Sequence, residues 1–114
     1  MKHLFVCEEL ILALKPCSRG RVRKFARRWP NGTKATLAVC REVWRLCARD
    51  CRWEHDVDWF VWQIVGTEAW CAFGDAANKA FGARGDKKLA EQAARALYRV
   101  LNSVARDSAE GGNR

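Results

Sequence analysis

The sequence lacks a long apolar segment and an export signal. None of its 114 residues belong to a stretch that approaches the roughly 18 consecutive apolar residues of a transmembrane helix. Residues 1–16 begin like a signal peptide, but Glu8 and Glu9 interrupt the apolar run and no small-residue cleavage site follows. We therefore expect a soluble, cytoplasmic protein that does not bind membranes.

The motifs of common enzyme families are absent as well. There is no P-loop, dinucleotide fingerprint, nucleophile elbow or metalloprotease histidine pair. Residues 54–58 gather three carboxylates around His55, a combination suited to acid–base chemistry or to a hard cation. The only other histidine is His3, and catalytic sites normally draw groups from several elements, so a helix-capping loop is the simpler interpretation. We predict a protein that is not an enzyme and needs no cofactor.

What the sequence does contain is enough apolar material for one folded domain. Hydrophobic residues make up 49% of the chain, with six Trp and five Phe, and the length suits a single core. Six cysteines in an exported chain would suggest disulfides, but without an export signal we expect reduced thiols.

Helical periodicity predicts an all-α fold. We expect a single compact bundle of four to six helices over residues 1–107 and a disordered tail over residues 108–114. The expected helices cover residues 4–15, 19–29, 33 to about 51, 59–81 and 86 onward. The fourth is either continuous or restarts after Gly66, and residues 53–58 are predicted to form a turn before it. The predicted N-caps are Ser18, Thr33, Asp56 or Asp58, Thr67 for a restart, and Asp86.

Positive charge dominates the surface that this fold would expose. The 21 Lys and Arg outnumber the 13 Asp and Glu by 8, which favours an acidic partner. Six cations within residues 19–29 flank Phe25 and Trp29, a pattern suited to phosphate contacts with base stacking. Two further stripes follow helical repeats, one in residues 41–52 and one in residues 88–106. The predicted residues for binding nucleic acid or an acidic partner are Arg19, Arg21, Arg23, Lys24, Arg27, Arg28, Arg41, Arg45, Arg49 and Arg52.

A simpler interpretation applies to the same cations. Residues 19–29 also fit a solvated amphipathic helix whose Val22, Phe25 and Trp29 face the core. Acidic residues dilute the other two stripes, and exposed arginines are an ordinary means of keeping a bundle soluble.

A zinc site is a weaker hypothesis. Cys47, Cys51 and His55 recur every four residues, and together with Cys71 they offer the thiolate and imidazole ligands that zinc prefers. However, Cys47 and Cys51 lie on the apolar stripe of their helix, and the short paired spacing of zinc knuckles is absent. We therefore predict no metal.

The tryptophans suggest a second kind of binding surface. Six of them exceed what a core of this size hides, so some should be exposed. Trp53 and Trp59, beside Arg49 or Arg52, have the composition of a protein-binding hot spot. The alternative places Trp44, Trp62 and Trp70 in the core and leaves the others half-buried; the two alternatives are left open.

The leading hypothesis is a small basic binding protein, a regulator or inhibitor that acts by occlusion on nucleic acid or on an acidic or nucleic-acid-associated protein. The alternative is a protein interaction module, possibly a homo-oligomer, that uses exposed Trp while the arginines only confer solubility. In style the chain resembles small accessory proteins of phages and mobile elements, and it matches no family of known activity.

Overall fold

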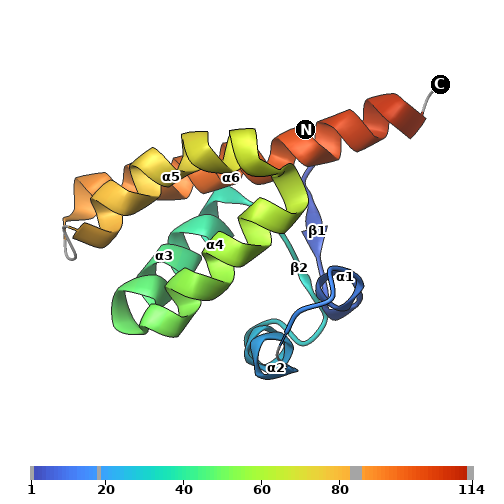
Figure 1. The fold of residues 1–114 in the computed structure, drawn as a ribbon, viewed down its shortest axis with the longest axis horizontal. Coiled ribbons are helices and arrows are strands. Elements are labelled where there is room, and N and C mark those ends of the chain that lie inside the picture. Colours follow the sequence, from blue (N-terminus) through green and yellow to red (C-terminus); the bar gives the residue numbers. More distant parts are fainter. Residues whose placement is uncertain (1, 18, 83–85, 113–114) are drawn as a thin grey trace.

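The fold is a helical bundle with a small β-ribbon at one end (Figure 1). The computed structural model describes residues 2–17, 19–82 and 86–112. In chain order the elements of these residues are β1 (Phe5–Val6), α1 (Glu8–Ala13), α2 (Arg19–Arg28), β2 (Thr33–Lys34), α3 (Leu37–Arg49), α4 (Cys51–Val65), α5 (Thr67–Gly82) and α6 (Lys87–Gly112). The prediction of an all-α bundle is confirmed, with the ribbon as an addition.

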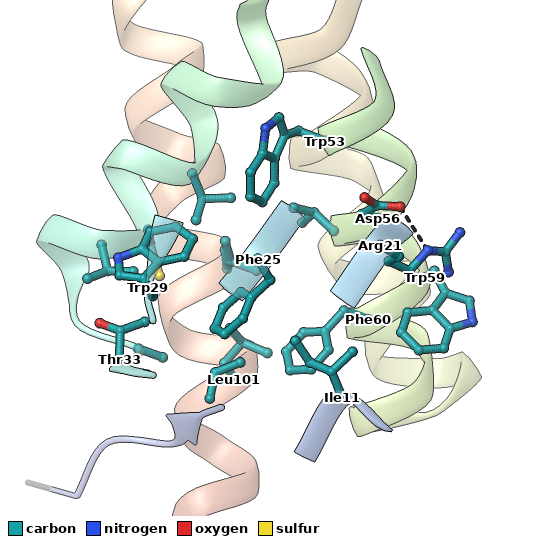
Figure 2. Close-up of a pocket in the computed structure, with 17 residues that line it drawn as sticks. Ile11, Arg21, Phe25, Trp29, Thr33, Trp53, Asp56, Trp59, Phe60 and Leu101 are labelled. Carbon is teal, nitrogen blue, oxygen red and sulfur yellow. Dashed lines mark ion pairs between the residues drawn. The ribbon is translucent and has the colours of Figure 1, made fainter. Parts of the chain in front are cut away.

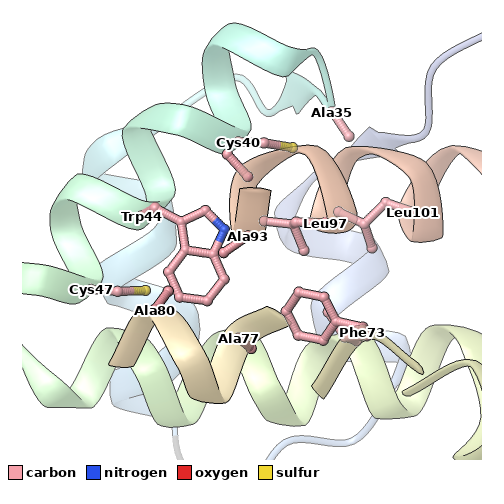
Figure 3. Close-up of a cluster of buried hydrophobic side chains, with 12 residues drawn as sticks. Ala35, Cys40, Trp44, Cys47, Phe73, Ala77, Ala80, Ala93, Leu97 and Leu101 are labelled. Carbon is pink, nitrogen blue, oxygen red and sulfur yellow. The ribbon is translucent and has the colours of Figure 1, made fainter. Parts of the chain in front are cut away.

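Two layers of helices form the main body. In Figure 1, α5 and α6 lie side by side along one edge of the molecule, and α3 and α4 form a hairpin against them. Trp44 of α3 and Phe73 of α5 meet in the core with ring centroids 6.2 Å apart. Small buried residues, including Ala77 and Ala93, allow α5 and α6 to approach each other closely (Figure 3).

The N-terminal elements form a smaller unit beside α4. Val6, Ile11 and Val22 make a second apolar cluster, against which Trp59 and Phe60 of α4 pack. Asn102, 5% exposed, joins this unit to α6. Its side chain accepts a hydrogen bond from the Leu4 backbone N–H (2.9 Å) and donates to the Ala35 carbonyl (2.9 Å). One buried amide therefore fixes the ribbon and the start of α3 against α6.

The ribbon corrects two predictions for the N-terminal region. Phe5 pairs with Lys34 and Val6 with Thr33 in an antiparallel register, so the first helix begins at Glu8 rather than residue 4. Thr33 lies in a strand and caps nothing; α3 is capped by Thr36, whose hydroxyl accepts a hydrogen bond from the Val39 N–H (3.2 Å). Strands of two residues are too short to show an alternating pattern in the sequence.

Gly32 makes the ribbon possible. Its φ of 78° lies in the left-handed region that favours glycine. A Cβ at this position would stand 2.7 Å from the Phe5 ring and 2.8 Å from the Val6 carbonyl oxygen. The chain therefore turns tightly against β1 before it enters β2.

The junction of α3 and α4 corrects a further prediction. Asp50 has an extended backbone (φ −146°, ψ 113°) that ends α3, and its side chain caps α4 by accepting from the Arg52 N–H at 2.9 Å. Residues 53–58 are therefore helical and not a turn, and neither Asp56 nor Asp58 is an N-cap. Of the acidic residues in this segment, only Glu54 lies in the first turn of α4, where a carboxylate interacts favourably with the helix dipole.

The break at Gly66 and the start of the last helix agree with the sequence, but the predicted cap Thr67 is itself the first residue of α5, and the Gly66 carbonyl accepts the first helical hydrogen bond from the Trp70 N–H. Gly66, with φ of 85°, ends α4, and a new helix starts at Thr67, so the restart rather than the continuous helix is found. Asp86 caps α6 by accepting from the N–H groups of Lys88 and Leu89, both at 3.0 Å. The backbone of α6 extends to Gly112. The predicted cap Ser18 and the end of the predicted tail, residues 113–114, lie outside the described residues.

Candidate functional site

The arginine-rich helix α2 turns one cationic edge toward the body of the protein. Arg21 Nε lies 2.8 Å from Asp56 Oδ1, and Lys24 Nζ pairs with the other oxygen of the same carboxylate. The Asp56 side chain is only 17% exposed. Arg28, at the end of α2, pairs with Glu42 of α3. These three members of the predicted binding set thus hold α2 on α3 and α4 instead.

The same three cations also cover aromatic rings, and Figure 2 shows Arg21 beside Trp59. Arg21 Cζ lies 4.5 Å from the centroid of the Trp59 ring, and Lys24 Nζ lies 4.8 Å from that of Trp53. Both distances are within the range of cation–π attraction. Trp29 packs edge-on against Trp53, with centroids 6.2 Å apart. Hence the rings that the sequence offered for base stacking or protein contact are half-buried within the molecule.

The opposite edge of α2 faces solvent. Arg19, Arg23 and Arg27 are all exposed, and within the described part of the chain none of them has an ion-pair partner. They stand four residues apart, so they lie on successive turns with a rise of about 6 Å between neighbours. We call these three residues the α2 stripe. It was contained in the predicted set, but the sequence did not separate it from the inward edge.

The arginines of α3 and α4 divide in the same way. Arg41 binds Glu91 of α6 through two hydrogen bonds, 2.7 Å from Nε and 2.8 Å from Nη2. Arg52 contacts Asp50 at 3.3 Å while its side chain remains 81% exposed. Arg45 and Arg49 are exposed and make no ion pair with any residue that the structure describes.

The turn between α3 and α4 lies next to α2. Lys24 of α2 covers the ring of Trp53, in the first turn of α4, and its charge contributes to lowering the pKa of Asp50. The larger causes of that lowered pKa are the hydrogen bonds from the backbone and side chain of Arg52. Arg49 and Arg52 flank Asp50 in the sequence, so the α2 stripe and these two arginines belong to neighbouring elements.

Known proteins give no guide to the use of this surface. Comparison with protein-family models, curated proteins and solved structures found no significant match to the chain. Among the described helices, none is both long and apolar enough to cross a membrane. The partners of this protein must therefore be inferred from the charges and shapes of its own residues.

The zinc candidates do not come together. Cys47 is 1% exposed and packs in the core, whereas Cys51, His55 and Cys71 are exposed. In the ranges that the structure describes, no group of three His, Cys, Asp or Glu side chains is placed to hold a metal ion.

The tryptophans are distributed differently from either alternative. Trp44 is buried, as the second alternative expected, but Trp62 is 46% exposed, and its indole N–H donates to the Thr67 hydroxyl (3.2 Å). Trp70 is half-buried and donates to Asp58 Oδ1 at 2.7 Å. Sequence reasoning missed the exposure of Trp62 because it lies in a continuous apolar run, residues 59–65, whose outward side is not evident from periodicity.

Proposed function

We propose that this protein is a non-enzymatic binding protein that docks on the phosphate backbone of nucleic acid through the α2 stripe, with Arg49 and Arg52 beside it. A regulator or inhibitor of this kind acts by occluding the bound segment from other proteins. The observation that carries the proposal is the α2 stripe: three exposed arginines on successive turns of one helix, with no ion-pair partner among the described residues.

Arginine is well suited to this task. Its guanidinium group forms charge-assisted, often bidentate hydrogen bonds to phosphate oxygens and stays charged at every physiological pH. Each phosphate that is neutralised releases condensed counterions, and this release drives association. The net charge of +8 adds a long-range attraction that accelerates the encounter.

The inward edge of α2 supports the outward one. Asp56 holds Arg21 and Lys24 together, and Glu42 holds Arg28, so α2 is fixed at both ends of its length. A helix held in this way presents its arginines in a preorganised row, which reduces the entropy lost on binding. In this proposal Arg21, Lys24 and Arg28, which form ion pairs within the molecule, hold the α2 stripe in position and do not contact the ligand.

A titration with matched variants tests the proposal. The ligand is a fluorescent DNA duplex at two salt concentrations, and the variant is Arg19→Gln, Arg23→Gln, Arg27→Gln. The control is Lys79→Gln, Lys88→Gln, Arg99→Gln, which removes the same charge from exposed positions on α5 and α6. We expect the stripe variant to lose roughly tenfold or more in affinity and to reduce the salt slope by about one for each phosphate contact removed. The control should lose much less.

Three outcomes would contradict the proposal. Equal losses in the two variants would show that net charge, and not the α2 stripe, governs binding. Equal affinity for poly-glutamate of matched charge would indicate an acidic protein as the partner. Absence of binding even at low salt would favour the second candidate, a protein interaction module, for which the observed exposure of Trp62 is the supporting feature.

A further inference from the structure

A partly open cavity of about 90 Å³ lies between α2 and the body formed by α3, α4 and α6. It is several times larger than the space that a single water needs. Its lining comes from both apolar clusters: Val6 and Ile11 belong to the smaller one, and Cys40 and Leu101 to the main core. The cavity therefore occupies the seam where the N-terminal unit meets the helical body.

Aromatic rings from two different elements line this cavity, together with aliphatic side chains. Phe25 and Trp29 approach from the α2 side, and Trp53 and Phe60 from α4 (Figure 2). The rest of the lining is aliphatic apart from Cys40 and a few polar side chains at its edge, and it includes the short side chain of Ala35. Space of this kind in a core forfeits dispersion contacts, which a ligand of matching shape would restore.

The lining of the cavity is almost wholly apolar, which favours an uncharged occupant. At its edge Arg21 pairs with Asp56 at 2.8 Å, Lys24 takes the other oxygen of that carboxylate, and the Thr33 hydroxyl donates to a backbone carbonyl at 3.2 Å. Arg21 Nη1 is buried and makes no hydrogen bond with the described residues, but one donor is too few to hold a water. Burial raises the pKa of the Cys40 thiol to about 12, so this group is neutral at physiological pH. Water needs two to four polar partners to remain in such a space, whereas apolar cavities stay dry and accept ligands such as benzene.

We propose that this cavity binds one small, uncharged aromatic molecule about the size of a single benzene ring. The volume sets the size, and the surrounding rings, which stack or meet edge-to-face with another ring, set the chemistry. The site lies beneath α2, on the side away from the α2 stripe, so it is separate from the proposed nucleic-acid surface.

Thermal unfolding with benzene and toluene as probes tests this site. A ligand that binds only the folded state raises its stability, so each probe should raise the Tm of the intact protein by a few degrees, and calorimetric titration should show one site per chain. Two variants fill the cavity independently: Cys40→Leu and Val43→Leu, both on α3 and both in its lining. The matched control is Val65→Leu, on a half-buried α4 residue outside the lining.

The filled variants should lose the ligand-induced shift, and the control should keep it. Either filled variant could pack poorly, so the rise in Tm with ligand is measured against that variant's own Tm without ligand. Loss of this rise in one variant that still folds is sufficient to support the proposal. If the intact protein shows no shift with either probe, the cavity is only a packing defect and the proposal is wrong. If both filled variants keep the full shift, the probes bind elsewhere and the proposal is equally wrong.

Discussion

Acidic side chains decide which cations on this surface are available to a ligand. Asp56 engages Arg21 and Lys24, Glu42 engages Arg28, and Glu91 engages Arg41 and Arg95. These pairs draw together residues as far apart in the sequence as 41 and 91, so their partners are not evident from spacing. Arginines that look equivalent in the sequence thus have different roles, some joining helices and others facing solvent.

The Glu91 carboxylate should make stability depend on acid pH. Hydrogen bonds from Arg41, assisted by those from Arg95, lower the pKa of Glu91 from 4.5 to about 2. Because the pKa of Glu91 is lower in the folded than in the unfolded chain, its ionised carboxylate stabilises the fold. This stabilisation is complete above pH 4.5 and is lost as the pH falls toward 2. We expect Glu91→Gln to remove the loss of stability that Glu91 causes between pH 4.5 and about 2, as measured by urea unfolding over that pH range.

The control for that experiment is Glu68→Gln on α5, an exposed carboxylate without an ion pair among the described residues. It should retain the acid-induced loss of the original protein. Identical pH profiles for the two variants would show that the Arg41–Glu91–Arg95 group contributes nothing to folding.

At the scale of elements, the sequence predicted α2 and α6 well but left the orientation of α2 undecided. The α2 residues were expected to form an amphipathic helix, and Val22 is indeed buried. However, both of its polar edges are cationic, and the inward one is selected by Asp56 of α4. That residue was expected in a turn, because the cap of α4 at Asp50 was not recognised. Because the cap at Asp50 was not recognised, the sequence did not identify Asp56 as the ion-pair partner of α2.

Asp56→Asn should loosen α2 without unfolding the main body. The change leaves Arg21 and Lys24 largely desolvated with no counter-charge, and it should cost about 2 kcal/mol, below the usual cost of breaking a fully buried pair because these groups are partly exposed. Hydrogen exchange should accelerate at the amides of α2, whereas those of α5 and α6 should be little changed. Uniform acceleration across all helices would contradict a local role.

The comparison for this variant is Asp75→Asn, which alters an exposed carboxylate on α5 with no ion pair in the described ranges. It should leave both stability and the exchange of α2 within experimental error of the original protein. If it loosens α2 as much as Asp56→Asn does, overall charge and not the ion pair holds the helix.

At the scale of the whole molecule, periodicity was sufficient for the all-α class but not for the way in which two apolar clusters meet. The main core follows from the regular stripes of α3 and α6. The cavity and the covered Trp53 and Trp59 arise at the seam between the clusters, where side chains from α2, α3, α4 and α6 come together. No local sequence window contains that information, because it depends on where the small N-terminal unit docks.

This seam also leads to a prediction about the form of nucleic acid. Binding of single strands generally relies on exposed aromatic rings that stack on unpaired bases, together with a cationic groove. Here Arg21 and Lys24 occupy the faces of Trp59 and Trp53, while the α2 stripe offers only arginines for phosphates. A DNA duplex should therefore compete more strongly than a single strand of equal length, and its binding should leave most of the tryptophan fluorescence unquenched. Tighter binding of the single strand, with strong quenching, would contradict this prediction. It would mean that α2 moves away from Trp53 and Trp59 when the protein binds, so that phosphate contacts are kept but the bound conformation differs from the one described here.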